Sequence, residues 1–388
     1  MFANGACEDG YPSTREMAMY MEEYESVMKF NVVRPVTVTG VTRTTMGTYL
    51  VETDCLLGGA PARWECRAVI SASGTHSTPI WPRLPGAEIF RGVQIHSSQY
   101  RNAEDFRGAR VAVVGGGNSG AQILAEVSQP GLATSTLWSL DAPPSFLPKD
   151  LPGKEIFDLG TFFFSCVSRF GPCRSFLSLL IIDSIIMQPG VVEASERGAY
   201  DDPVPAITRF TRHGIAWDAA TMTDKEGVTT TLPAGEGEVD AVIWCTGYQA
   251  NISHLARLGI VREDTTLAMD GADMCEAANQ PGVFAVGYGN WAGVGSGSIP
   301  GATMYAKRAA SAAIQHVRGE TAFSTASLYA ARAASAMLSS GSPSSGWPVA
   351  GRAVASAWPG AGRASAHGPQ ALAAAGSPSM PEMVSAAA

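Results

Sequence analysis

The segment from Arg110 to Gly120 constrains the fold of this chain more than any other. It reads RVAVVGGGNSG, an apolar run that ends in the pattern G-x-G-x-x-G. In this pattern Gly115 allows a tight turn, Gly117 lets the backbone approach a phosphate group, and Gly120 lets the next helix pack closely on the sheet. The helix is predicted by apolar residues at helical spacing, which are Ala121, Ile123, Leu124 and Val127. The segment therefore predicts a strand, a turn and a helix that bind a dinucleotide pyrophosphate, with a glycine-rich turn that binds no ligand as the alternative.

The residues around this turn bear on which dinucleotide would bind. Asn118 and Ser119 open the predicted helix, where free backbone N–H groups attract an anion. Asp141 lies about 20 residues beyond the last glycine, where an acid binds the ribose diol of NADH and repels the 2′-phosphate of NADPH. However, Asp141 begins a proline-rich turn, where aspartate is common for local reasons, and Lys149 is a candidate phosphate partner. The sequence leaves the choice between NADH and NADPH open.

Composition sets the remaining bounds. The chain has 388 residues, of which 46% are hydrophobic and 16% charged, so it is long enough to bury a large core and form two domains. A net charge of −8 argues against general binding to nucleic acid or to anionic membranes. The seven cysteines contain no C-x-x-C, which indicates buried thiols in a reducing compartment, and we expect a cytoplasmic protein. No cluster of His, Cys and carboxylate residues at ligand spacing predicts a metal.

One apolar segment resembles a membrane span. It runs from Phe162 to Met187, but two arginines, a proline and Asp183 interrupt it before about 20 uncharged residues accumulate. We expect two buried or interfacial helices there and no integral span. The second, Ser175 to Met187, is expected to cover a face of the nucleotide domain or of a partner in a homodimer.

The first hundred residues predict several further elements. A capping box at Ser13 opens a helix that runs to Met28, and residues 36–43 and 48–52 alternate as a hairpin. A buried strand from Arg67 ends in Gly74 and Thr75. The same pattern returns at residues 241–248, where the strand ends in Thr246 and Gly247. Such ends suit places where the backbone passes a cofactor or crosses between domains, although an ordinary glycine turn is the alternative at each.

The order of these motifs resembles a known family, the class B flavoprotein monooxygenases. The family signature F-x-G-x-x-x-H-x-x-x-W/Y is matched by Phe90, Gly92, His96 and Tyr100, and the glycine motif follows it directly. Within the class, residues 107–126 and 284–291 are most similar to the subgroup often associated with arsenic resistance. The resemblance covers roughly residues 10 to 318, and the combined motifs are specific.

The resemblance implies two cofactors, FAD and NADPH, with NADH as an alternative. In such enzymes NADPH reduces FAD, oxygen adds to give a flavin hydroperoxide, and that species oxygenates a small soft nucleophile or a carbonyl compound. His96 would lie in a linker that rearranges between the two half-reactions, with a hydrogen-bonded interdomain histidine as the alternative. Gly74, Thr75, Thr246 and Gly247 would contact FAD or the interdomain crossing. Gly289 and Asn290 stand where the family has Gly-Asp, and an asparagine can still bind a ribityl hydroxyl.

The chain departs from the family near its first residues. Nothing from Met1 to Asp54 supplies the strand and G-x-G-x-x-G that hold FAD in the family. We therefore expect a sheet with an exposed apolar flank and an incompletely covered flavin, with a truncated gene as one cause. The alternative function is an NAD(P)-binding protein without turnover. A disulfide reductase shares the architecture but needs a C-x-x-C, which is absent.

The expected fold class is α/β. A Rossmann-like NAD(P)H-binding domain (106–235) is inserted in a truncated FAD-binding Rossmann-like domain (1–105 and 236–320). Residues 321–388 are mostly Ala, Ser, Gly and Pro and predict a disordered tail, and the last folded element is expected to be a helix from Met304 to Val317. The expected partners are a small-molecule substrate and O2.

Overall fold

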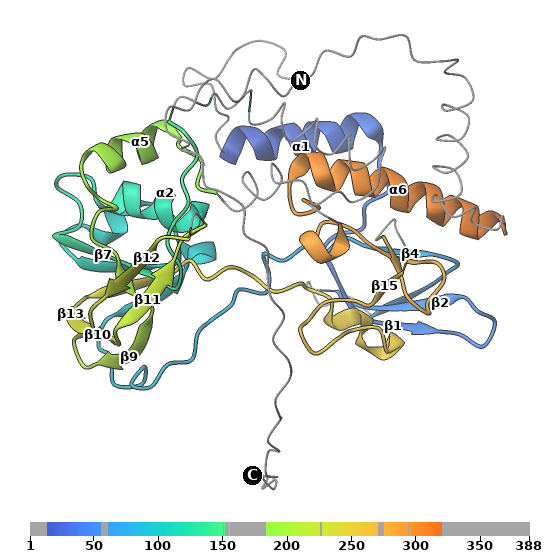
Figure 1. Ribbon diagram of the computed structural model, residues 1–388. Coiled ribbons are helices and arrows are strands. Elements are labelled where there is room, and N and C mark those ends of the chain that lie inside the picture. Colours follow the sequence, from blue (N-terminus) through green and yellow to red (C-terminus); the bar gives the residue numbers. More distant parts are fainter. Residues whose placement is uncertain are drawn as a thin grey trace, which may run out of the picture. The chain divides into compact units, whose positions relative to one another are not determined.

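The computed structural model describes residues 14–55, 61–149, 151, 155, 184–225, 227–270, 275–293 and 295–319 (Figure 1). The chain divides into two units, Met1–Ala333 and Ala334–Ala388, and only the first contains described residues. The predictions for Ser13, for residues 162–183 of the apolar segment and for the tail lie outside the described residues. The last four residues of that segment, 184–187, are not helical as expected, because Ile185 forms a β-bridge with Phe146 instead.

A five-stranded parallel sheet organises the middle of the chain. Its strands are β5 (Val93–His96), β6 (Arg110–Val114), β7 (Ser135–Leu140), β8 (Val204–Pro205) and β14 (Ala241–Trp244), in the order β5-β14-β6-β7-β8. Residues in β6 and β14 are almost all buried, which explains their continuous apolar runs, because parallel strands are covered on both faces. The expected α/β class with a parallel sheet is confirmed.

Helix α2 (Asn118–Val127) follows β6 and packs on this sheet with α5 (Pro189–Glu196). Its apolar stripe is the one that the sequence predicts, and Leu124 is fully buried in the same cluster as Val113. The hydroxyl of Tyr200 donates to the carbonyl oxygen of Ala121 at 2.7 Å, which fixes the segment after α5 against α2. The strand, turn and helix expected from the glycine motif are therefore present.

Antiparallel strands that the sequence does not predict lie between α5 and β14. A three-stranded sheet has the order β13-β10-β9, and β11 pairs with β12. Their bounds are β9 (Ile207–Thr211), β10 (Gly214–Trp217), β11 (Ala220–Thr223), β12 (Thr229–Leu232) and β13 (Gly235–Glu238). Strand β13 reads GEGE, which has low β-propensity. A Cβ at Gly235 would lie 2.9 Å from the Trp217 ring, so glycine is needed for the indole to approach this strand.

A second antiparallel sheet has the order β1-β2-β3. The predicted hairpin is confirmed, since β1 (Val36–Arg43) pairs with β2 (Tyr49–Cys55), although β2 continues past Glu52. The third strand, β3 (Ala62–Cys66), is not predicted by the sequence pattern.

A four-stranded sheet contains the strands that end in Gly-rich turns. Its order is β15-β16-β17-β4, with β15 (Met269–Asp270), β16 (Glu276–Ala277), β17 (Val283–Ala285) and β4 (Val69–Ser71). β4 is shorter than the expected strand from Arg67 to Thr75, and it pairs in parallel with β17. Among the described strands it is the outermost of this sheet, and Ile70 is 44% exposed.

The remaining helices are α1 (Thr14–Met28), α6 (Ile299–Arg318) and short 3-10 turns, of which η3 (Ser253–Leu258) and η4 (Asn290–Ala292) are two. α6 begins more than a turn before the expected Met304. The Ser298 hydroxyl caps it by accepting from the N–H of Gly301 at 3.3 Å, and a proline in the first turn needs no hydrogen-bond acceptor for its nitrogen. Within the described part of the chain, no helix has the length and apolar character that a membrane crossing requires.

Candidate functional site

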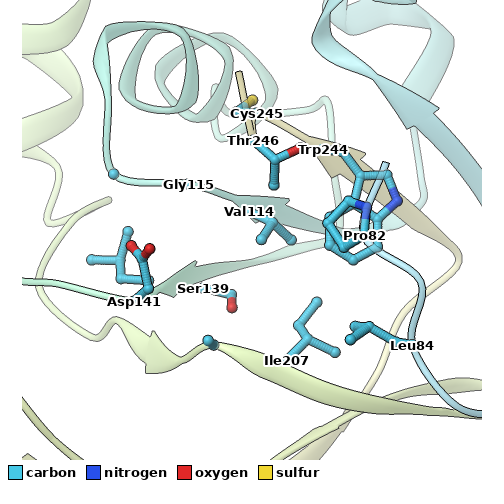
Figure 2. Close-up of a pocket in the computed structure, with 13 residues that line it drawn as sticks. Pro82, Leu84, Val114, Gly115, Ser139, Asp141, Ile207, Trp244, Cys245 and Thr246 are labelled. Carbon is cyan, nitrogen blue, oxygen red and sulfur yellow. The ribbon is translucent and has the colours of Figure 1, made fainter. Parts of the chain in front are cut away.

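A pocket opens at the carboxyl ends of β6, β7 and β14 (Figure 2). Its volume is about 350 Å³. From β6 the chain continues to β7 and β8 on one side, while β14 and β5 lie on the other side. The crevice where strand order reverses is the usual ligand site of an open parallel sheet. Gly115, Asp141 and Thr246, which the sequence places in three separate motifs, line this one pocket.

The glycine turn forms one wall of the pocket. Gly115 has φ +122°, and a Cβ there would lie within 3.0 Å of the Cys245 carbonyl oxygen. A Cβ at Gly120 would lie equally close to the carbonyl oxygen of Gly115. Both glycines are therefore required by close backbone packing, as the sequence motif predicts.

Gly117 differs from the other two glycines. It has ordinary extended geometry, with φ −91° and ψ −177°, and a Cβ added there would meet no atom within 4 Å. It is the N-cap of α2, and no side chain caps the helix there. The first N–H groups of α2 therefore have no side-chain acceptor from the cap, and the helix dipole makes this end attractive to an anion.

The next two residues, Asn118 and Ser119, begin α2. The Asn118 amide nitrogen donates to the Ser184 carbonyl oxygen at 3.1 Å, and its side-chain oxygen accepts from the N–H of Ile186 at 2.8 Å. Its side chain thus anchors the segment before α5, so a contact to a dinucleotide would come from its backbone. Ser119 is exposed.

Cys245 lies behind the turn and lines the pocket. Burial raises the pKa of its thiol to about 12, so the neutral thiol is the form present at neutral pH. A nucleophilic or redox-active cysteine needs a lowered pKa, so burial disfavours such a role for Cys245. Cys66 and Cys245 are free thiols.

The segment around Gly74-Thr75 and the segment around Thr246-Gly247, called here the two Gly-Thr segments, lie side by side and are joined by hydrogen bonds. The N–H of Ile80 donates to Gly247 O at 3.0 Å, and the N–H of Asn251 donates to Gly74 O at 3.0 Å. The Thr246 hydroxyl also donates to Ile80 O at 2.6 Å, while Thr75 accepts from the N–H of Thr78 at 3.0 Å. Gly74 and Gly247 have positive φ, of +66° and +79°. The recurrence of Gly and Thr in the sequence therefore marks two segments that bind each other.

His96 ties the end of β5 to this pair of segments. It is fully buried; its Nδ1 lies 3.1 Å from the backbone nitrogen of Ser98, and its Nε2 lies 3.0 Å from the Gly247 carbonyl oxygen. Because Nδ1 accepts from the N–H of Ser98, the proton resides on Nε2 and is donated to Gly247. The Tyr248 ring contacts the imidazole edge-on, with 4.9 Å between centroids. A neutral histidine that holds a turn accounts for every one of these contacts.

The other residues of the Phe90-to-Tyr100 signature also have structural contacts. The Phe90 ring packs so closely against Gly92 that a Cβ at position 92 would overlap the ring. Phe90 in turn packs on Phe210, with 4.9 Å between ring centroids. The Tyr100 hydroxyl donates to the Glu126 carboxylate at 2.7 Å.

A buried polar chain crosses the carboxyl ends of β4 and β17, and the sequence does not reveal it. The Ser71 hydroxyl lies 2.9 Å from His254 Nε2 and also bonds the hydroxyl of Tyr288. The Tyr288 hydroxyl accepts from the N–H of Ser73 at 3.0 Å. Nearby, Gly289 has φ +99°, and the Asn290 side-chain oxygen accepts from the N–H of Gly295 at 3.0 Å. These hydrogen bonds fix the ends of β4 and β17, which lead to Gly74 and Gly289.

The two buried histidines predict a pH dependence of stability. Burial lowers the pKa of both His96 and His254 from their ordinary value. The unfolded chain therefore binds more protons than the folded one below about pH 6.5, so this stability is fully present above that pH and is lost as pH falls. We expect a lower urea midpoint at about pH 5.5 than at about pH 7.5, and a smaller difference in the His254→Gln variant.

Asp240 provides the contrast. Hydrogen bonds from Arg110 lower the pKa of Asp240 to about 2. The contribution of Asp240 to the free energy of unfolding is therefore the same at about pH 5.5 and about pH 7.5. An Asp240→Asn variant should keep the full difference between the two pH values. Equal midpoints for the parent chain at both values would contradict the prediction.

Three comparisons define what the chain is similar to. The family model described as pyridine nucleotide-disulphide oxidoreductase matches residues 3–139. The structure of a flavin-containing monooxygenase from Stenotrophomonas maltophilia is 33% identical, with a TM-score of 0.62 over 80% of this chain and 79% of that one. A doubly substituted form of a flavin monooxygenase from the same organism is 34% identical, with a TM-score of 0.62 over 78% and 77%.

Curated relatives are more distant. Probable indole-3-pyruvate monooxygenase YUCCA9 of Arabidopsis thaliana is 25% identical over 62% of this chain. Indole-3-pyruvate monooxygenase YUCCA4 of Oryza sativa subsp. japonica is 24% identical over 52% of it. The chain spans 59% and 48% of the length of these two relatives.

The parallel sheet with its glycine turn defines a dinucleotide-binding α/β fold. The likeness to the Stenotrophomonas enzymes makes the assignment specific: the chain belongs to the class B flavin-dependent monooxygenase family.

Several pocket residues are not predicted by the sequence. Pro82 and Leu84 reach the pocket from the segment before β5, and Ile207 reaches it from β9. None of them carries a sequence signal, because their position depends on how distant segments meet. In the part of the chain that the structure describes, no three His, Cys, Asp or Glu side chains are grouped to hold a metal.

Proposed function

We propose that this chain is an FAD- and NAD(P)H-dependent monooxygenase that acts on a small soft nucleophile or a carbonyl compound. One observation carries the proposal: the pocket at the switch point of the sheet combines a glycine turn that has positive φ with an uncapped helix N-terminus, in a member of a monooxygenase family. Family membership favours turnover over the alternative of nucleotide binding alone.

The residues present fit a dinucleotide. The uncapped N-terminus of α2 would hold the pyrophosphate, and the open space at Gly117 would let phosphate oxygens approach the backbone. Asp141 and the wall formed by Ile207 and Trp244 would hold the adenosine end in the pocket. The chain thereby fixes where the nucleotide lies before any transfer of hydride.

The residues that would hold FAD lie at the ends of β4 and β17. Ligands bind at the carboxyl ends of adjacent parallel strands, and these two strands lead to Gly74 and Gly289, both with positive φ. Thr75 and Asn290 follow these glycines. FAD, when bound, supplies hydride acceptance from NAD(P)H and activation of O2. The overall reaction consumes NAD(P)H, one proton, O2 and substrate, and yields NAD(P)+, oxygenated substrate and water.

The protein's own contribution is to position and to shield. His96 and the paired Gly-Thr segments would set the path between the two cofactor regions, since they join β5 to the turn at Gly247. The pocket wall is apolar apart from a few groups, which suits exclusion of water from the bound nucleotide.

Purification of the 388-residue chain tests this function. We expect flavin absorbance to follow the protein through gel filtration, and NAD(P)H oxidation to be matched by O2 uptake. The measurements are the visible spectrum, absorbance of the reduced nucleotide and an oxygen electrode. A colourless protein that binds NAD(P)H but does not oxidise it after addition of FAD would refute the proposal.

A further inference from the structure

The part of the pocket wall that the structure describes carries a single charge. Its lining consists of apolar side chains, backbone and a few neutral polar groups, together with the carboxylate of Asp141. Cys245 is neutral there because burial raises its pKa to about 12. No lysine or arginine belongs to the lining formed by the described residues. A ligand in this pocket therefore meets an anion and, among the described lining residues, no compensating cation.

The position of Asp141 is fixed by the sheet. Strand β7 pairs in parallel with β6, with Val114 opposite Ser139, and the N–H of Gly115 donates to Ser139 O at 2.9 Å. Asp141 follows β7 directly, so its carboxylate lies at the same edge as the glycine turn. Figure 2 shows Asp141 and Gly115 on the same side of the pocket.

A carboxylate at this edge distinguishes two ligands. An acid at the end of the strand after the glycine helix accepts hydrogen bonds from the 2′- and 3′-hydroxyls of the adenosine ribose. In NADPH a phosphate replaces the 2′-hydroxyl, which removes one donor and places a second anion beside Asp141. Asp141 is exposed, so water screens part of this repulsion, and the loss of the hydroxyl donor adds to what remains in disfavouring NADPH.

Two cations near the pocket in the described part of the chain, Lys149 and Arg83, lie outside its lining. Lys149, the alternative phosphate partner, has its Nζ 3.6 Å from the carboxylate of Glu196 and does not line the pocket. Arg83 stands between two lining residues, Pro82 and Leu84, but its own side chain is exposed and outside the lining.

We infer that this site selects NADH over NADPH and that Asp141 is the residue that determines the selection. The inference rests on the proposed dinucleotide site and sharpens the cofactor, for which the family resemblance alone implies NADPH.

Binding measurements test the inference without turnover. We titrate the purified protein with NADH and with NADPH, and follow binding by calorimetry. The parent chain should bind NADH at least about tenfold more tightly than NADPH. In Asp141→Asn the carboxylate becomes a neutral amide of the same shape. The affinities of this variant for NADH and NADPH should therefore differ by no more than about threefold.

Two further variants keep the test specific. Asp218→Asn makes the same charge change at an exposed residue after β10, outside the pocket lining, and should leave both affinities unchanged. Lys149→Ala should also leave NADPH binding unchanged. A parent chain that binds NADPH as tightly as NADH, or an Asp141→Asn variant that keeps the parent ratio, would overturn the inference while leaving the proposed function intact. Failure of both nucleotides to bind would overturn the proposed site itself.

Discussion

Replacement of Gly120 by alanine is expected to destabilise the fold by about 3 kcal/mol, because the added methyl group has no space. The new Cβ would lie within 3.0 Å of the Gly115 carbonyl oxygen, which belongs to the rigid turn after β6. Relief would require α2 to move away from the sheet, and α2 buries Ala121, Leu124 and Val127 there. Urea unfolding followed by far-ultraviolet circular dichroism measures the loss.

Gly190 provides a matched control for this change. It lies in the first turn of α5, and an added Cβ there meets no atom within 4 Å. Gly190→Ala is expected to leave stability unchanged or to raise it by up to about 1 kcal/mol, because alanine favours a helix more than glycine does. If Gly120→Ala unfolds at the same urea concentration as the parent chain, the close packing of α2 on the turn is not what requires glycine at this position.

The elements around the pocket can be predicted because their signals are local. β6 and β14 are continuous apolar runs, and the turn between β6 and α2 needs glycine at fixed positions, so sequence spacing alone locates them. The hairpin of β1 and β2 is predicted in the same way from alternation around a Gly turn. Each of these signals lies within a few residues of the structure it specifies.

The elements that escape prediction depend on distant partners. Strand β13 is formed from glutamate and glycine and is stable because its glycines admit the indole of Trp217. Ser71, His254 and Tyr288 meet although 183 and 217 residues separate the bonded pairs. Neither set of contacts produces a local pattern in the sequence, because both arise from tertiary packing that overrides propensity.

The strand order around the candidate site also depends on distant partners, so it cannot be predicted from local sequence. Sequence motifs suggest that Asp141 and Thr246 each lie near a cofactor, but not that both line one pocket with Gly115. That meeting requires β14 to pair with β6 on the side opposite β7. A strand that returns to the sheet after more than a hundred residues cannot be placed from local spacing.

Gly117→Ala should separate nucleotide binding from folding. The backbone at Gly117 is extended, with φ −91°, and no protein atom lies within 4 Å of the added Cβ, so the folded chain accommodates alanine. The methyl group would instead occupy the space through which phosphate oxygens approach the N–H groups of α2. We expect NADH to bind at least about tenfold more weakly, a loss of about 1.4 kcal/mol, with a urea midpoint close to that of the parent chain.

Calorimetric titration with NADH, beside the Gly190→Ala control, gives the comparison. Alanine at an N-cap is less favourable than glycine, so a loss of stability of up to about 1 kcal/mol is compatible with this expectation. Unchanged NADH affinity would show that the pyrophosphate does not lie on the N-terminus of α2. Because Gly120→Ala acts through packing and Gly117→Ala through the ligand, the two variants together assign each glycine of the motif its own physical task.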